Sequence, residues 1–172
     1  MWLTFLAVVV VSFATLIFMR PVAEKVGLID KPNFRKRHQG FIPLIGGIAL
    51  FLGTLTFYAF QADTLPLPEL YLLSMTILLI IGVLDDRFDI SPALRAGIQA
   101  ILAGAMIYSG LELESLGQII APFSIKLGFF SLIFTVFITI GVINAFNMVD
   151  GIDGLLAGLS SVSFAGIGAL MW

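Results

Sequence analysis

Six apolar runs, separated by short polar segments, dominate the 172-residue sequence. A helix rises about 1.5 Å per residue, so about 20 apolar residues cross a hydrocarbon core about 30 Å thick. The runs lie at Trp2–Met19, Phe41–Phe60, Leu70–Leu84, Ala93–Leu111, Leu127–Ile143 and Leu155–Trp172. This pattern predicts an all-α, polytopic membrane helix bundle of about six transmembrane helices, the third being the shortest.

Composition favours a membrane protein over a soluble one. Hydrophobic residues make up 59% of the chain and charged residues 12%, whereas about a quarter of the residues in soluble domains are charged. The absence of Cys excludes disulfides and thiolate metal sites. The first run lacks a basic leader and a small-residue cleavage site, which indicates a retained span rather than a signal peptide. We expect one integral membrane domain over residues 1–172.

Basic residues are distributed unevenly among the connections. Eight of the nine Lys and Arg residues follow the first and third runs, and only Lys126 lies in the connections after the second and fourth. By the positive-inside rule, the first, third and fifth connections are cytoplasmic and both termini lie outside.

Three acids within five residues follow the third run: Asp85, Asp86 and Asp89. One interpretation is a solvated turn, with Ser91 as the N-cap and Pro92 as the first residue of the next helix. The other is a site for a metal, a phosphate or proton transfer. Neighbouring carboxylates repel each other unless a cation offsets them, which favours the second interpretation.

Two carboxamides and two carboxylates recur every three residues at the end of the fifth run. They are Asn144, Asn147, Asp150 and Asp153. Residues three apart are helix neighbours, and we expect Gly151 and Gly154 to break the helix here. Oxygen ligands of this kind match Mg²⁺, with Mn²⁺ as the alternative, because these ions bind few protein oxygens together with substrate phosphates. Interhelical hydrogen bonding with Asp caps is the other interpretation.

The connection after the first run is strongly basic. Its cations attract anionic headgroups at about 1 kcal/mol each. The candidate phosphate contacts in it are Arg35, Lys36 and His38, the only histidine. A purely topological role for these charges is the alternative.

Three segments together resemble a known family. The segments Arg35–Gly47, Asp85–Asp89 and Asn144–Leu155 resemble, in order and spacing, the polyprenyl-phosphate N-acetylhexosamine-1-phosphate transferases. The closest resemblance is to the branch that uses undecaprenyl phosphate and N-acetylglucosamine. The family's later cytoplasmic loops, with a further metal-binding acid and a histidine-rich motif, are absent. We therefore expect the N-terminal part of a longer transferase, inactive when expressed alone.

The resemblance implies a reaction, its partners and its location. N-acetylglucosamine 1-phosphate would pass from UDP-N-acetylglucosamine to undecaprenyl phosphate, releasing UMP and starting a cell-envelope polysaccharide such as the lipopolysaccharide O-antigen. The expected partners are these two substrates and membrane lipid, without nucleic acid; a homodimer is left open. The expected location is the bacterial cytoplasmic (inner) membrane, as a multi-pass protein with a cytoplasmic active face.

Residue roles follow from the same resemblance. The implied catalytic residues are Asp85, Asp86, Asp150 and Asp153. The implied substrate-binding residues are Asp89, Arg95, Asn144, Arg35, Lys36 and His38. The implied ligands of Mg²⁺ are Asn147 and Asp150. Direct attack by the lipid phosphate and a covalent Asp intermediate both stay open.

A transporter with an Asp and Asn cation site at helix ends is the alternative function. Transporters place such groups near the bilayer midplane, whereas every acid here follows the end of a run. The position of the acids favours the enzyme.

Overall fold

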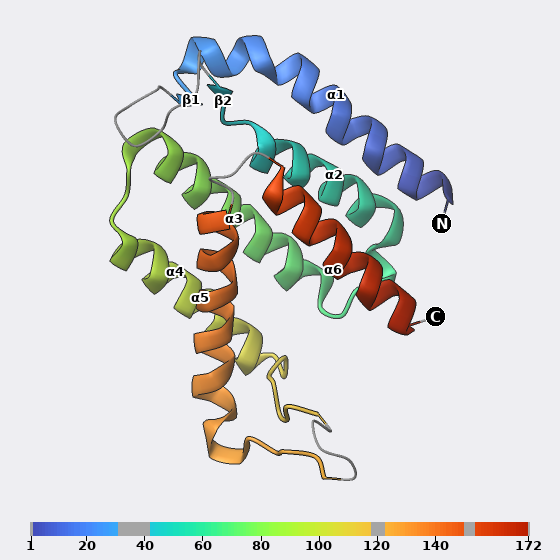
Figure 1. Cartoon of the computed structure of the whole chain (residues 1–172), viewed down its shortest axis with the longest axis vertical. Coiled ribbons are helices and arrows are strands. Elements are labelled where there is room, and N and C mark those ends of the chain that lie inside the picture. The colour runs from blue at the N-terminus through green and yellow to red at the C-terminus, as the bar shows by residue number, and fades with distance from the viewer. Residues whose placement is uncertain (1, 31–41, 118–122, 150–153, 172) are drawn as a thin grey trace. The chain divides into compact units, whose positions relative to one another are not determined.

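The computed structural model describes residues 2–30, 42–117, 123–149 and 154–171, and most of them are helical (Figure 1). The α-helices are α1 Trp2–Val26, α2 Gly46–Gln61, α3 Pro68–Phe88, α4 Pro92–Tyr108, α5 Ser131–Val149 and α6 Leu155–Met171. Short 3₁₀ turns, η1 Ala62–Thr64 and η2 Gly128–Phe130, precede α3 and α5, and β1 Ile29–Asp30 pairs with β2 Ile42–Pro43. The all-α prediction is confirmed, apart from this two-residue strand pair.

Among the described residues, three helices are long and apolar enough to cross a membrane: α1, α3, and α5 taken together with η2. At most 11% of each spanning window is buried within the chain, so their apolar surfaces are left for lipid or other helices. The remaining helices, α2, α4 and α6, are apolar but only 16, 17 and 17 residues long. The membrane helix bundle is supported, and the number of six spans stays a prediction.

The prediction that the third run forms the shortest helix is wrong. Helix α3 has 21 residues. It begins at Pro68. The first turn tolerates proline, which lacks an N–H, because an N–H there would have no partner within the helix. The helix also continues through Asp85 and Asp86 to Phe88. Hydropathy shows where the apolar surface ends, but the backbone hydrogen bonds continue for a further turn.

The chain forms two compact units, Met1–Arg95 and Ala96–Trp172, each described by itself. In the first unit, Ala23, Leu28 and Ile45 form a small buried core between the end of α1, the strands and the start of α2. The antiparallel pairing sets Ile29 opposite Pro43. Asp30 and Ile42, the residues on either side of the basic connection at residues 31–41, are therefore paired neighbours.

Helices α1 and α2 approach closely at Gly53. A Cβ atom at this position would overlap the Ser12 hydroxyl and lie 3.4 Å from a methyl group of Val8. Small residues allow such approach between membrane helices, where dispersion packing holds the helices together.

We expect Gly53→Val to destabilise the fold by about 1–3 kcal/mol, because the added atoms overpack the contact between α1 and α2. Thermal unfolding in detergent would measure the loss. Gly104→Val in α4 is the matched control, since nothing lies within 4 Å of its Cβ position. Equal shifts of the unfolding midpoint in both variants would contradict the packing assignment.

Candidate functional site

The first acid cluster lies in the last turn of α3. Asp89 ends the helix in the left-handed conformation, with φ +52°, and its N–H donates to the Asp85 carbonyl at 2.8 Å. The chain then reverses into α4, where the Ser91 hydroxyl accepts from the Leu94 N–H at 3.3 Å. Ser91 is thus the N-cap and Pro92 the first helical residue, as the interpretation of a capped turn proposed. Because Asp89 leaves the helix, it does not continue the helical face of Asp85.

The turn brings Asp85 into an ion pair with Arg95 in the first turn of α4. The side chains of Arg95 and Asp85 are only 20% and 18% exposed, and the Arg95 Nε is buried without a hydrogen-bond partner. The helix cap and the charged cluster therefore coexist. Arg95 supplies a cation that offsets the charge of Asp85.

Arg87 links the acid cluster at the end of α3 to the end of α1, just before the basic connection. Its guanidinium donates to the Val26 carbonyl at the end of α1 and lies 5.4 Å from the centroid of the Phe88 ring. A cation at a helix C-terminus satisfies a carbonyl and stabilises the helix dipole. The end of α3 is thereby fixed beside the segment that leads into β1 (Figure 1). The charge pattern of the sequence indicated only a topological role for Arg87.

Asp86 lines a cavity of about 340 Å³ between α2 and α3. The rest of its lining is largely apolar and includes Phe51, Met75 and Gly82. A carboxylate therefore lies at the border of an apolar cavity. Asp89 is exposed at the helix end.

The second cluster begins within the last two turns of α5, which carry Asn144 and Asn147. The Asn144 amide nitrogen donates to Gln99 Oε1 in α4 at 3.0 Å and to the Ile140 carbonyl at 2.8 Å. These two bonds use the amide hydrogens and fix the direction of the amide oxygen. Asn147, almost one turn further on, is exposed. The break before α6 is confirmed at Gly154, whose φ is +75°.

Five predicted site residues fall outside the described residues: Arg35, Lys36, His38, Asp150 and Asp153. Their roles stay predictions. Within the described ranges, no group of three or more His, Asp or Glu side chains is placed to hold a metal ion.

The sequence motifs did not indicate Gln99, a residue that is only 6% exposed and whose side chain accepts the Asn144 hydrogen bond. A signal was available, because Gln99 lies four residues after Arg95 in an otherwise apolar run. Residues with this spacing are neighbours on one helix face.

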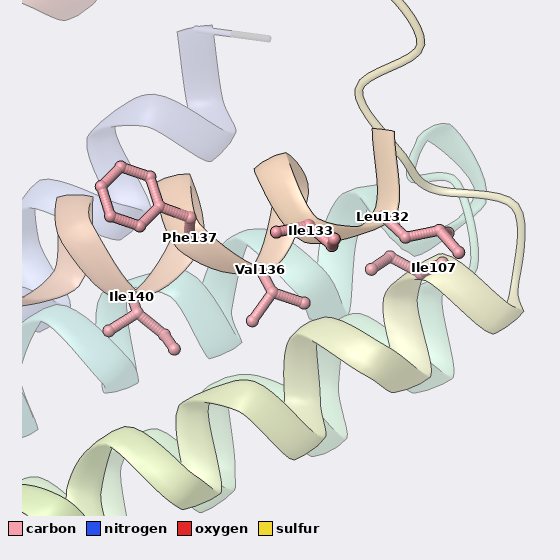
Figure 2. Close-up of a pocket in the computed structure, with 6 residues that line it drawn as sticks. All are labelled: Ile107, Leu132, Ile133, Val136, Phe137 and Ile140. Atoms are coloured by element: carbon pink, nitrogen blue, oxygen red, sulfur yellow. The ribbon is translucent and has the colours of Figure 1, made fainter. Parts of the chain in front are cut away.

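A second cavity, of about 560 Å³, lies between Ile107 of α4 and the first turns of α5 (Figure 2). Figure 2 shows Leu132 beside Ile107, with Val136 and Ile140 further along α5. All the residues that line it are apolar, so this surface adds no acid, base or metal ligand to the site.

Comparison with known proteins identifies related sequences. The family described as glycosyl transferase family 4 matches residues 69–172. A Haemophilus influenzae protein named undecaprenyl-phosphate alpha-N-acetylglucosaminyl 1-phosphate transferase is 62% identical over 94% of this chain and 46% of its own length. Proteins of the same name from Pasteurella multocida and Escherichia coli K12 are 61% and 53% identical, over 93% and 91% of this chain. The alignments cover 45% and 43% of those relatives.

The chain thus spans about half the length of the curated relatives it matches. No solved structure matches it.

Proposed function

The chain belongs to glycosyl transferase family 4, and from this we propose that it is part of a membrane enzyme that transfers N-acetylglucosamine 1-phosphate from UDP-N-acetylglucosamine to undecaprenyl phosphate. The observation that carries the proposal is the 62% identity, over 94% of the chain, to a relative named for this transfer. The family resemblance of the three sequence segments is confirmed by the same relatives and by the family match. The product would start a cell-envelope polysaccharide.

In the proposed reaction, a phosphate oxygen of the lipid attacks the β-phosphorus of the UDP-sugar. A new P–O bond forms, and the bond from that phosphorus to the bridging oxygen of the α-phosphate breaks. UMP leaves with the bridging oxygen, and the lipid carries a diphosphate linked to the sugar. Such phosphoryl transfers depend mainly on positioning and on neutralising charge.

The residues of the chain fit these two needs. Asp85, held by Arg95, and Asp86 are proposed to orient the lipid phosphate or accept its proton. Asp150 and Asp153 are proposed to organise the nucleotide. Weaker proposed contacts to substrate are Asp89, Asn144, Arg35, Lys36 and His38.

We propose that Asn147 and Asp150 hold Mg²⁺, with Mn²⁺ as the alternative ion. The exposed carboxamide of Asn147 in the last turn of α5 is the type of oxygen donor that these hard cations accept. A bound ion would neutralise phosphate charge.

The active face is proposed to be cytoplasmic, in a bacterial inner membrane. The nucleotide arrives from water and the polyprenyl phosphate within the leaflet, so the two can meet only at an interface. The described acids suit this position, because Asp85 and Asp86 lie in the last turn of the candidate span α3. A transporter would place such groups nearer mid-span.

Sealed vesicles carrying the complete open reading frame would test the function and the face together. UDP-N-acetylglucosamine with a radiolabelled sugar is expected to label the lipid fraction of inside-out vesicles, and only when undecaprenyl phosphate is present. Right-side-out vesicles should show labelling only after permeabilisation. If neither inside-out vesicles nor permeabilised right-side-out vesicles label the lipid, the proposed function is contradicted. Labelling of intact right-side-out vesicles would contradict the proposed face.

We predict that Arg95 acts through Asp85. Arg95→Gln in the complete protein should lower kcat by about 10²-fold, a loss typical of one preorganised charged group, with little change in KM for the UDP-sugar. Groups that act as a pair give non-additive losses. The kcat of the double variant Asp85→Asn/Arg95→Gln should therefore be close to that of the less active single variant. The variant Arg95→Lys should recover part of the rate that Arg95→Gln loses.

Arg20→Gln is the control, because Arg20 is an exposed arginine in α1, a helix that carries none of the proposed site residues. If Arg95 instead contacts substrate phosphate independently of Asp85, KM for the UDP-sugar rises in Arg95→Gln. The rate losses of the two single variants then multiply in the double variant.

A further inference from the structure

Two described segments of the connection from α4 to α5, residues 113–117 and 123–127, pair in antiparallel fashion and are together called the hairpin. Ser115 pairs with Lys126, and the Leu116 N–H donates to the Ile125 carbonyl at 2.9 Å. Successive side chains of a strand point to opposite faces. Leu116 and Ile125 therefore share one face, while Ser115 and Lys126 share the other. Phe123, two residues before Ile125, lies on the apolar face.

The base of the hairpin is fixed to the first two turns of α5. The Leu113 N–H donates to Thr135 Oγ1 at 3.0 Å, and the Leu113 carbonyl accepts from Ser131 Oγ at 2.8 Å. Both hydroxyl residues are buried, and both lie inside the candidate span Gly128–Val149. Backbone groups beside lipid must be satisfied within the protein, and these two hydroxyls provide this for Leu113. The hairpin is thus held at the depth where the span begins.

The apolar face of the hairpin is exposed. In the sequence it is followed directly by two phenylalanines at the start of the candidate span Gly128–Val149. Phe123 is 73% exposed, and Phe129 and Phe130 are 84% and 66% exposed. Ile125 and Leu116 are exposed as well. Water-soluble proteins rarely expose large apolar patches. Because these exposed apolar residues lead directly, in sequence, into a candidate membrane span, lipid is the occupant that the observations favour.

We propose that this hairpin, residues 113–117 and 123–127, is an interfacial anchor. Its apolar face, Leu116, Phe123 and Ile125, lies at the boundary between lipid headgroups and acyl chains, as do the apolar faces of amphipathic interfacial elements. Lys126, on the opposite face, extends toward lipid phosphates and water. The anchor lies at the opposite end of α5 from Asn144 and Asn147 (Figure 1). It would fix the depth and rotation of the helix that carries these two residues.

Nitroxide labels on single cysteines would measure the depth of each face. The complete protein, with any other cysteine changed to serine, is reconstituted in vesicles of phosphatidylethanolamine and phosphatidylglycerol. Labels at Ile125→Cys and Phe123→Cys are expected to collide several-fold more often with oxygen, relative to a water-soluble nickel chelate, than a label at Ser124→Cys. Ser124 is the matched control because it is exposed and lies between the two test positions on the opposite face.

Two results would overturn the anchor. If labels at 123 and 125 meet the nickel chelate as often as the label at 124, the apolar face lies in water. If they meet neither reagent, a second copy of the chain or another part of the protein covers the face. Each variant is first required to match the unlabelled protein in membrane level and in size-exclusion profile. Transfer activity is not the readout, so failure of the anchor is distinguishable from failure of the proposed function.

Discussion

Asp85→Asn and Asp86→Asn in the complete protein should each lower the transfer rate by about 10²–10³-fold, the range found when a preorganised charge-stabilising group is removed. Both carboxylates lie in the last turn of α3, beside the Arg95 and Arg87 contacts that fix that turn. An amide keeps the shape of the side chain but loses the charge. Initial rates of lipid labelling, normalised to the amount of membrane protein, would measure the effect.

Asp63→Asn is the matched control, since Asp63 is an exposed acid in η1. It should transfer sugar phosphate at the wild-type rate. The level of each variant in the membrane should also equal that of wild type, because a neutral amide at a span end inserts no less readily than a carboxylate. Wild-type turnover by both Asp85→Asn and Asp86→Asn would reduce the cluster to a structural turn.

Asn147→Ala should lower activity by about 10²-fold, or raise the Mg²⁺ concentration needed for half-maximal rate, because a preorganised ligand oxygen is lost. Asn147 is exposed in the last turn of α5, so the substitution leaves no cavity and should spare the fold. Titration of the transfer rate with Mg²⁺, and separately with Mn²⁺, would measure the effect.

Met148→Ala is the control for Asn147→Ala, since the neighbouring Met148 side chain is 82% exposed and offers no hard oxygen. Its rate and Mg²⁺ dependence should match wild type. An Asn147→Ala protein with an unchanged rate and an unchanged Mg²⁺ titration would exclude Asn147 from the metal site.

The helices could be predicted from hydropathy because lipid-facing segments need long apolar surfaces. Their ends could not be predicted in the same way. Helix α1 continues past Met19 to Val26 and α3 past Leu84 to Phe88, since backbone hydrogen bonding does not stop where charged side chains begin. Hydropathy therefore located the helices but placed Asp85 and Asp86 after α3 rather than within it.

The site was predicted best where the interactions are local. The Ser91 cap depends on residues three apart, and sequence showed it directly. Arg95 was assigned to substrate phosphate, whereas its contact in the structure is Asp85, ten residues away across a turn. Gln99 and Asn144 meet across 45 residues. Contacts of this kind depend on how helices pack, which residue type and spacing alone do not determine.

The most direct test of the central claim follows the phosphorus atom of the donor. UDP-N-acetylglucosamine labelled with ³²P in the β-phosphate is incubated with undecaprenyl phosphate and membranes carrying the complete protein. Transfer of the sugar 1-phosphate predicts that the ³²P appears in the lipid fraction and that unlabelled UMP accumulates in equal amount. If the ³²P instead stays in water as UDP while the sugar reaches the lipid, the enzyme transfers the glycosyl group alone and the proposed reaction is wrong.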